Sequence, residues 1–320
     1  MNPAKLAEAL NNRSLHLILM NTEKCNFRCV YCYEDFLLGK MPSDVITGVK
    51  NLITIRAESL DILYVSWFGG EPLLQTAVIK DVMTHAIKVC CTHGIPLKSG
   101  MTTNGYNLSI ETLGMLCDLH VNEFQITLDG DSKSHNTTRL RADGKGTFKK
   151  IWRNFRAAHE SNLQFKIMIR MHVTSRNYDS IVSLVRQIIQ ELRNDERFSL
   201  TFHKVNDYKQ SESPIYLDST KYADILSKLK NEAKLHCVNT LPRDSDYICY
   251  AAKPNSLVVR ADGSLAKCTV AFNHDENKIG RLCADGSLTL DAKKMKFWLG
   301  GFETVDEDFL GCPAAHLTNW

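Results

Sequence analysis

Short apolar runs alternate with amphipathic stretches over the first 205 residues of the chain. The apolar runs predict buried strands, and the stretches between them, such as SDVITGVKNLITIRAESL and DSIVSLVRQIIQELRNDE, have the spacing of helices with one apolar face. The predicted strands are Leu15–Met20, Ile62–Phe68, Leu97–Thr103, Phe124–Leu128, Phe165–Thr174 and Leu200–Val205. This alternation predicts a parallel α/β fold, either an incomplete barrel or a wound sheet, with ligands at the C-terminal ends of the strands.

The pattern changes after residue 205. The stretch TKYADILSKLKNEAKLHC predicts a helix, and NSLVVRADGSLAKC predicts a hairpin that turns at Ala-Asp-Gly-Ser. We therefore expect a barrel over residues 1–205, a linker helix over 206–245 and a small domain over 246–320.

Composition places the chain among soluble globular proteins, with 320 residues, 44% hydrophobic and 23% charged. The net charge of +3 is too small to indicate nucleic acid or an acidic membrane as a partner. No apolar run approaches the roughly 18 residues of a membrane span, and the N-terminus lacks a secretory signal. We therefore expect a cytoplasmic protein, in which eleven cysteines favour metal or cluster ligation over disulfides.

Three cysteines, Cys25, Cys29 and Cys32, follow the first predicted strand within EKCNFRCVYCYEDF. They lie on a loop at the C-terminal end of that strand. Thiolates at this spacing can hold three irons of a [4Fe-4S] cluster, which leaves the fourth iron open to a substrate or cofactor. A zinc site with a distant fourth ligand is the alternative that the spacing leaves open.

The next two strands end in glycine-containing motifs. In WFGGEP, Gly69 and Gly70 allow close backbone approach, and Glu71 is an acceptor suited to an ammonium group. In TTNG, Asn104 can face a cofactor. Each motif is also compatible with an ordinary turn.

The fourth strand ends in ITLDGDSKSHNTTR, which contains Thr127, Asp129 and Arg139. Arginine makes bidentate contacts with carboxylates, and these three side chains suit a ribose and a carboxylate. The alternative for Asp129 and Arg139 is an exposed surface pair. His135, in the same stretch, is more simply a residue that shapes the loop.

Taken together, these motifs resemble the radical S-adenosylmethionine (SAM) superfamily. The resemblance rests on Cys-x3-Cys-x2-Cys with Tyr31 before the last cysteine, Gly-Gly-Glu-Pro, and LDGD…H…R followed by GKGTF. Within this superfamily, the LDGD…H…R stretch followed by GKGTF resembles one branch in particular. That branch modifies peptides, carries a SPASM or Twitch extension and includes the anaerobic sulfatase-maturating enzymes. The resemblance implies a partial (β/α)6 TIM-like barrel with a small C-terminal iron–sulfur domain.

The resemblance also implies the cofactors and their ligands. The open iron would chelate S-adenosylmethionine, and one electron, from a donor such as flavodoxin or ferredoxin, would cleave it to a 5′-deoxyadenosyl radical that abstracts hydrogen. Tyr31 lies where the family packs an aromatic near the adenine. The implied cofactor-binding residues are Tyr31, Gly69, Gly70, Glu71, Asn104, Thr127, Asp129 and Arg139.

A second set of cysteines resembles the opening of a SPASM or Twitch domain. Cys249 and Cys268 flank the predicted hairpin, and KIGRL follows it; the alternative is two buried free thiols. Cys312 is the third expected ligand of an auxiliary cluster, although a Twitch domain would place another cysteine at Ala315. The fourth ligand stays open among Cys283, Cys237, His316 and a substrate.

The main expectation is a radical SAM enzyme that modifies a ribosomally made peptide or protein, with a cyclised or cross-linked peptide as the leading product. A Cα epimerase and a sulfatase-type oxidation of Ser or Cys are the alternatives among enzymes. Thr269 follows Cys268 where the sulfatase-maturating enzymes carry an Asp base, which disfavours formylglycine formation. A zinc- or cluster-binding regulatory or electron-transfer protein is the alternative outside enzymes.

Overall fold

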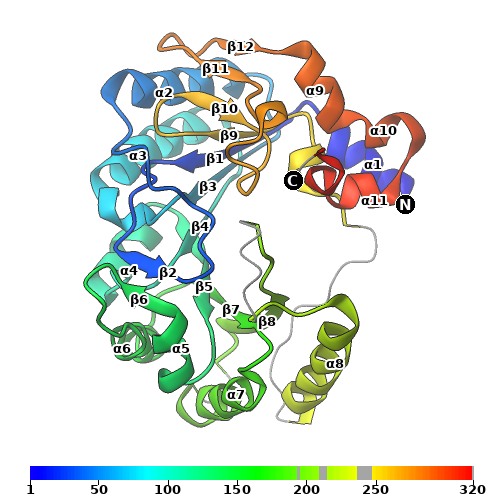
Figure 1. The fold of residues 1–320 in the computed structure, drawn as a ribbon. Coiled ribbons are helices and arrows are strands. Elements are labelled where there is room, and N and C mark those ends of the chain that lie inside the picture. Colours follow the sequence, from blue (N-terminus) through cyan, green and yellow to red (C-terminus); the bar gives the residue numbers. More distant parts are fainter. Residues whose placement is uncertain (193–194, 209–214, 236–246, 319–320) are drawn as a thin grey trace. The chain divides into compact units, whose positions relative to one another are not determined.

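The computed structural model describes residues 1–192, 195–208, 215–235 and 247–318 (Figure 1). The chain divides into two compact units. The first unit contains residues 1–24, 34–100 and 243–320, and the second contains residues 25–33 and 101–242. The short segment 25–33 therefore separates from its neighbours in the chain and belongs with the second unit.

The first unit contains the N-terminal βα repeats and the C-terminal part of the chain. Its N-terminal elements are α1 (Pro3–Leu10), β1 (Ser14–Met20), α2 (Ser43–Ala57), β3 (Ile62–Phe68), η1 (Pro72–Gln75) and α3 (Thr76–His93). Its C-terminal elements are η2 (Tyr250–Ala252), β9 (Ser256–Val259), β10 (Ser264–Ala266), η3 (Asp275–Asn277), β11 (Gly280–Leu282), β12 (Leu288–Leu290), α9 (Ala292–Leu299), α10 (Gly301–Thr304), α11 (Glu307–Gly311) and η4 (Pro313–His316).

The sheet of the first unit runs in the order β12-β11-β10-β9-β1-β3. β1 is parallel to both β3 and β9, with Leu17 paired to Val65 on one side and to Leu257 on the other. β1 is nearly all apolar and buried, as expected of a strand covered on both faces. Helices α2 and α3 lie side by side along β1 and β3 (Figure 1).

The predicted hairpin is present as β9 and β10, which pair antiparallel. It adds to the edge of the β1 sheet through the parallel pairing of β9 with β1. The two ends of the first unit also meet, since Ala9 of α1 packs with Ile248, Ala252 and Leu310 in one apolar cluster. The C-terminal segment is thus anchored to the first strand and to the first helix.

The second unit contains the remaining βα repeats. Its elements are β2 (Phe27–Cys29), α4 (Ile110–Asp118), β5 (Val121–Leu128), α5 (Ser132–Thr138), β6 (Arg139–Arg141), α6 (Phe148–His159), β7 (Lys166–Val173), α7 (Tyr178–Leu192), β8 (Phe198–Lys204) and α8 (Ser219–Leu235). β5, β7 and β8 are parallel neighbours, and β2 pairs antiparallel with β6. β4 (Leu97–Thr103) has residues 97–100 in the first unit and 101–103 in the second.

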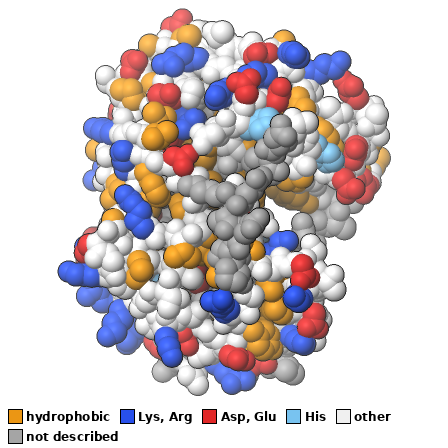
Figure 2. Space-filling view, viewed as in Figure 1, with side chains coloured by type: hydrophobic (Ala, Val, Ile, Leu, Met, Phe, Trp, Pro, Cys, Tyr) orange, Lys and Arg blue, Asp and Glu red, His pale blue; other side chains and the backbone are white. Residues whose placement is uncertain are grey.

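All six predicted strands are present, as β1, β3, β4, β5, β7 and β8, and each end lies within three residues of its predicted position. The predicted linker helix is α8, while part of the linker, including Cys237, lies outside the described residues. Over the described parts of the chain, every helix is too short or too polar to traverse a lipid bilayer. Figure 2 shows acidic and basic side chains interspersed on the visible surface.

Candidate functional site

The cysteine loop is held in the second unit by a short two-stranded ladder. Cys29 is the last residue of β2, and its backbone pairs directly with that of Arg139 at the start of β6. Cys25, Cys29 and Cys32 all keep partial exposure. Burial raises the pKa of the Cys29 thiol, and the positive charge of Arg139 opposes that rise. Arg139 is therefore placed to favour a thiolate at Cys29.

Asn104 lies beside the first cysteine. Its Nδ2 donates to the side chain of Asn26 at 2.8 Å and lies 3.9 Å from Cys25 Sγ. Its Oδ1 accepts from the backbone N–H of Tyr106, which is an Asx turn. Asn104 thus forms the turn after β4 and also contacts the cysteine loop.

Tyr31 joins the cysteine loop to the end of β5. Its hydroxyl lies 2.9 and 2.7 Å from the two carboxylate oxygens of Asp129, and it accepts from Arg139 Nη1 at 2.9 Å. Thr138 Oγ1 donates to the same carboxylate at 2.5 Å. Asp129 is fully buried and Arg139 is 8% exposed, so they do not form the exposed surface pair that the sequence left open.

This network also sets the protonation preferences of its members. Burial raises the pKa of Asp129, while Arg139 and the hydrogen bonds from Thr138 and Tyr31 lower it. Burial likewise raises the pKa of Tyr31 well above its ordinary value. Arg139 Nε is buried and makes no hydrogen bond with any described residue. This buried donor is thus left without an acceptor among the described residues.

His135 supports the loop that carries Asp129 and Arg139. Its Nδ1 accepts from the backbone N–H of Asp129, and its Nε2 is 2.9 Å from Thr147 Oγ1, which in turn donates to the carbonyl of Arg139. His135 is fully buried, and burial lowers its pKa well below the ordinary range. These contacts agree with the interpretation that His135 shapes its loop.

The Gly-Gly-Glu motif lies in the first unit, against the segment that leads into the cysteine loop. Gly70 and Glu71 donate backbone hydrogen bonds to the carbonyls of Thr22 and Lys24. A Cβ at Gly70 would lie 2.3 Å from the carbonyl oxygen of Glu23, so only glycine fits there. Glu71 is fully buried, and one carboxylate oxygen accepts from the backbone N–H of Leu73 at the start of η1.

Two polar residues of β7 belong to none of the motifs identified in the sequence. Arg170 and His172 alternate with apolar residues in KIMIRMHV, so both lie on the same face of the strand. His172 Nδ1 is 3.8 Å from Asp129, and the ring of His172 contacts that of Tyr31 edge-on at 5.2 Å. The polar side chains of Arg170 and His172 among buried apolar neighbours were the signal available in the sequence. Thr127 occupies the β5 position paired with Arg170 and is 8% exposed.

The second set of cysteines lies in the first unit. Cys268 is buried and Cys249 is partly buried, whereas Cys312 is exposed. Burial raises the pKa of Cys268 to about 11, and the neighbouring thiols of Cys249 and Cys312 add to this rise. Burial raises the pKa of Cys249, again with a contribution from Cys312. The Cys312 thiol is therefore close enough to Cys249 and Cys268 to raise the pKa of both.

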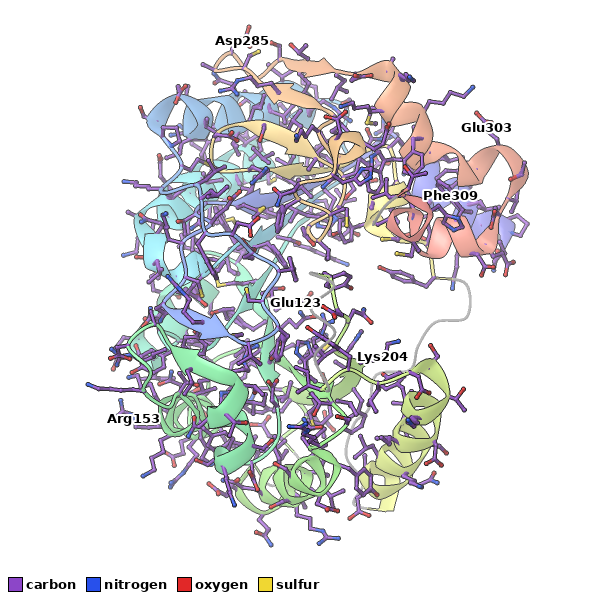
Figure 3. All side chains as sticks on the ribbon, in the orientation of Figure 1. Glu123, Arg153, Lys204, Asp285, Glu303 and Phe309 are labelled. Carbon is purple, nitrogen blue, oxygen red and sulfur yellow. The ribbon has the colours of Figure 1, made fainter. Side chains whose placement is uncertain are left out.

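The two described protein candidates for a fourth ligand, Cys283 and His316, lie in different parts of the first unit. Cys283 lies at the β11–β12 turn, with its carbonyl against Gly48 of α2. The ring of His316 stacks on Phe309 at 4.7 Å (Figure 3). Thr269, which replaces the Asp base, is buried and hydrogen-bonded to the hydroxyl of Tyr250.

No three His, Cys, Asp or Glu side chains among the described residues converge on a point that a single metal ion would fill. A four-iron cluster sets a different requirement, because each thiolate binds a different iron. The thiols have the ligand chemistry of such a cluster.

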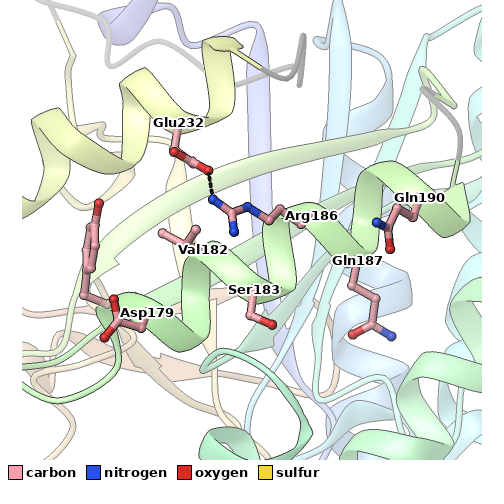
Figure 4. Close-up of a pocket in the computed structure, with 8 residues that line it drawn as sticks. Asp179, Val182, Ser183, Arg186, Gln187, Gln190 and Glu232 are labelled. Carbon is pink, nitrogen blue, oxygen red and sulfur yellow. Dashed lines mark hydrogen bonds and ion pairs between the residues drawn. The ribbon is translucent and has the colours of Figure 1, made fainter.

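A separate hollow of about 530 Å³ lies between α7 and α8 in the second unit (Figure 4). Arg186 and Glu232 form an ion pair across it at 2.9 Å. None of the sequence-predicted site residues lines it. It is therefore distinct from the network around Tyr31 and Asp129.

A family model agrees with the motifs. The model described as "Radical SAM superfamily" matches residues 21–188, just over half of the chain. The Caenorhabditis elegans protein "Molybdenum cofactor biosynthesis protein moc-5" is 24% identical over 272 residues, which cover 79% of this chain and 43% of that protein. The cysteine-type anaerobic sulfatase-maturating enzyme of Clostridium novyi (strain NT) is 26% identical over 225 residues, which cover 67% and 58%. The chain spans about half the length of these relatives.

Solved structures share the fold. The structure of native anSMEcpe with bound AdoMet has a TM-score of 0.69 and 20% identity, covering 90% of this chain and 82% of that chain. Streptococcus suis SuiB bound to precursor peptide SuiA has a TM-score of 0.64 and 17% identity, covering 94% and 69%. These likenesses confirm the predicted partial (β/α)6 barrel with its parallel sheet.

Proposed function

The chain belongs to the radical SAM superfamily, and from that premise we propose that it is a radical enzyme acting on a ribosomally made peptide. The observation that supports cofactor binding most strongly is the placement of Arg139 opposite Cys29, next to the network of Tyr31 and Asp129. The peptide substrate is proposed by analogy, since SuiB was solved with its precursor peptide and another relative is a sulfatase-maturating enzyme.

The donor set fits a [4Fe-4S] cluster with one open iron. Cys25, Cys29 and Cys32 supply three thiols on one loop, and no fourth cysteine lies in that loop. A zinc site would need a further ligand, and no such group of His, Cys, Asp or Glu forms among the described residues. When bound, the cluster and S-adenosylmethionine supply a carbon-centred radical that abstracts hydrogen.

The residues of the chain bind and orient the cofactor. Arg139, with its unpartnered Nε, is assigned to the carboxylate of the methionine moiety. Asp129 is held by Tyr31 and Thr138 and is assigned, with Thr127, to the ribose. Burial of this network excludes water, which protects a reactive radical.

The remaining assignments come from the loops at other strand ends. Glu71 is assigned to the ammonium group, with Gly69 and Gly70 keeping its loop close to the backbone of residues 22–24. Asn104 positions the first cysteine and faces the cofactor. An electron donor such as flavodoxin or ferredoxin would reduce the cluster.

We also propose the domain organisation predicted from the sequence. Residues 1–205 would form the catalytic barrel, 206–245 the linker, and 246–320 an auxiliary domain. Cys249, Cys268 and Cys312 would hold an auxiliary iron–sulfur cluster, a proposal supported by the effect of Cys312 on the pKa of both Cys249 and Cys268. Its fourth ligand is left unassigned.

Cross-linking or cyclisation is the proposed reaction. Joining two peptide atoms removes two hydrogens, one as an atom taken by the radical and one as a proton, and it releases one electron. The auxiliary cysteines would hold the acceptor for that electron. Epimerisation at Cα needs no such acceptor. Sulfatase-type oxidation would need a base, and Thr269 cannot serve as one.

Incubating the reconstituted protein with a precursor peptide encoded beside its gene tests the proposed reaction. Cross-linking predicts a product lighter by two hydrogens, with no fragmentation between the joined residues in tandem mass spectrometry. A product whose mass is unchanged in H2O but is raised by deuterium uptake in D2O would indicate epimerisation. A product that reacts with a hydrazide probe would indicate an aldehyde instead. An unmodified peptide, with no cleavage of S-adenosylmethionine, would favour a regulatory or electron-transfer protein.

A further inference from the structure

Arg170 is an arginine without a partner in the second unit. It forms no hydrogen bond or ion pair with any described residue, and its Nε is shielded from solvent. Arg170 as a whole keeps partial exposure, and burying part of a guanidinium is costly unless a counter-charge compensates it. Burial lowers the pKa of Arg170, and so does the positive charge of Arg139, whereas Tyr33, Tyr208 and Tyr31 raise it. Among the described residues, no carboxylate compensates this cation.

Polar side chains flank Arg170 on the two neighbouring strands. Strand register places Thr127 of β5 and Thr201 of β8 on either side of it, on the same face of the sheet. One step along β7, His172 contacts the ring of Tyr31. The three tyrosines that act electrostatically on Arg170 are Tyr31, Tyr33 and Tyr208.

The one buried carboxylate nearby is already engaged. Asp129 receives hydrogen bonds from Tyr31 and Thr138, and its charge acts on Arg139. His172 supplies no charge, because burial and the two arginines lower its pKa well below the ordinary range. Asp129 thus acts on Arg139, while the described residues supply no carboxylate for Arg170, whose positive charge a ligand can balance.

We propose that Arg170 binds a carboxylate of the substrate peptide, with Thr127 and Thr201 as flanking hydrogen-bonding groups. This inference rests on the proposed peptide-modifying function, which it deepens by specifying an acidic substrate. The carboxylate can come from an Asp or Glu side chain or from the peptide C-terminus. A polyphosphate fits less well, since Asp129 lies in the same network and would repel further negative charge.

Binding of short peptides to the reconstituted protein tests this proposal without requiring turnover. The probes are acetyl-Gly-Gly-Glu-Gly-Gly-amide, its Gln counterpart, and acetyl-pentaglycine with a free C-terminal carboxylate, compared by ligand-observed NMR. We expect at least one carboxylate probe to bind about tenfold more tightly than the Gln peptide, as a charged hydrogen bond implies. The probe that binds more tightly identifies the source of the carboxylate.

Two variants link this difference to Arg170. Arg170→Gln should remove the preference for the carboxylate, while Arg170→Lys should keep part of it. Arg186→Gln is the matched control, because Arg186 lies on α7 and pairs with Glu232 away from this face. Equal binding of the Glu, Gln and free-acid probes to the unaltered protein would overturn the proposal, and so would an undiminished preference in Arg170→Gln.

Thermal unfolding separates a binding role from a structural one. Because no described residue pairs with this partly buried guanidinium, Arg170→Met should raise the melting temperature, whereas removal of an arginine required by the fold would lower it. Failure of the proposed radical function would appear as absent 5′-deoxyadenosine with carboxylate binding intact. Failure of the present proposal would appear as 5′-deoxyadenosine formation without any carboxylate preference. The two failures are therefore distinguishable.

Discussion

The backbone of Cys29 pairs directly with that of Arg139 across the β2–β6 ladder. This pairing places Cys29, in the loop after β1, next to Arg139, in the segment after β5. The same arginine contacts the Tyr31 hydroxyl at 2.9 Å. The cysteine loop and the strand-end loop are therefore joined by both backbone and side-chain contacts.

Removing Arg139 should weaken cofactor binding without removing iron. Arg139→Met takes away the proposed carboxylate partner, so the dissociation constant for S-adenosylmethionine should rise about tenfold or more, as loss of a charged hydrogen bond implies. Isothermal titration calorimetry and iron analysis measure the two quantities. Arg141→Met is the control on the same strand, since Arg141 pairs with Asp143 at 2.8 Å. Equal affinities in both variants would contradict the assignment.

Gly70 should tolerate no side chain. An added Cβ would lie 2.3 Å from the carbonyl oxygen of Glu23 and 2.5 Å from that of Lys24, directly before the cysteine loop. Gly70→Ala should therefore destabilise the protein by about 2 kcal/mol or more. Gly39→Ala is the control, because nothing lies within 4 Å of its added Cβ. Urea denaturation compares the two, and indistinguishable midpoints would be inconsistent with this packing.

Loss of Cys268 should halve the iron content. If the chain holds two four-iron clusters, Cys268→Ala should lower iron from about eight to about four atoms per chain, leaving the cluster of the cysteine loop intact. Cys91→Ala, in an exposed position of α3, should change nothing. Iron and sulfide analysis provides the measurement. About four irons in the unaltered protein would remove the auxiliary cluster from the account.

His16 should make stability depend on pH. Burial and the charges of Lys253 and Lys267 lower its pKa to about 4 in the folded chain, below the ordinary value of 6.5. The contribution of neutral His16 to the free energy of unfolding is therefore complete above pH 6.5 and is lost as the pH falls toward 4. Between pH 7 and 5 the free energy of unfolding should fall by about 2 kcal/mol. His16→Gln should flatten this dependence in urea denaturation, while His93→Gln, at an exposed helix end, should not. A pH profile unchanged in His16→Gln would show that another group is responsible.

The strands and the site differ in how much of them the sequence could predict. Strands such as β1 and β3 were predictable because short apolar runs of this kind are typical of strands buried in a parallel sheet. The candidate cofactor residues could be proposed from motifs at strand ends, and their role stays a prediction. Their partners were not, because the Tyr31–Asp129 contact joins residues 98 positions apart. Periodicity gives no information about such a contact.

Arg170 illustrates the remaining limit of sequence reasoning. It belongs to no motif, and an arginine in a strand usually points to solvent. Only the register of β7 against β5 and β8 places it beside Thr127 and Thr201. Likewise, the attachment of β9 to β1 could not be foreseen from a hairpin motif, since pairing between residues about 240 positions apart leaves no local signal.

Formation of 5′-deoxyadenosine tests the central claim most directly. The protein is reconstituted anaerobically with iron and sulfide, reduced with dithionite and supplied with S-adenosylmethionine, and the nucleoside is quantified by liquid chromatography and mass spectrometry. The account predicts 5′-deoxyadenosine from the unaltered protein and none from Cys29→Ala. No 5′-deoxyadenosine from iron-loaded unaltered protein, or an equal amount from Cys29→Ala, would contradict it.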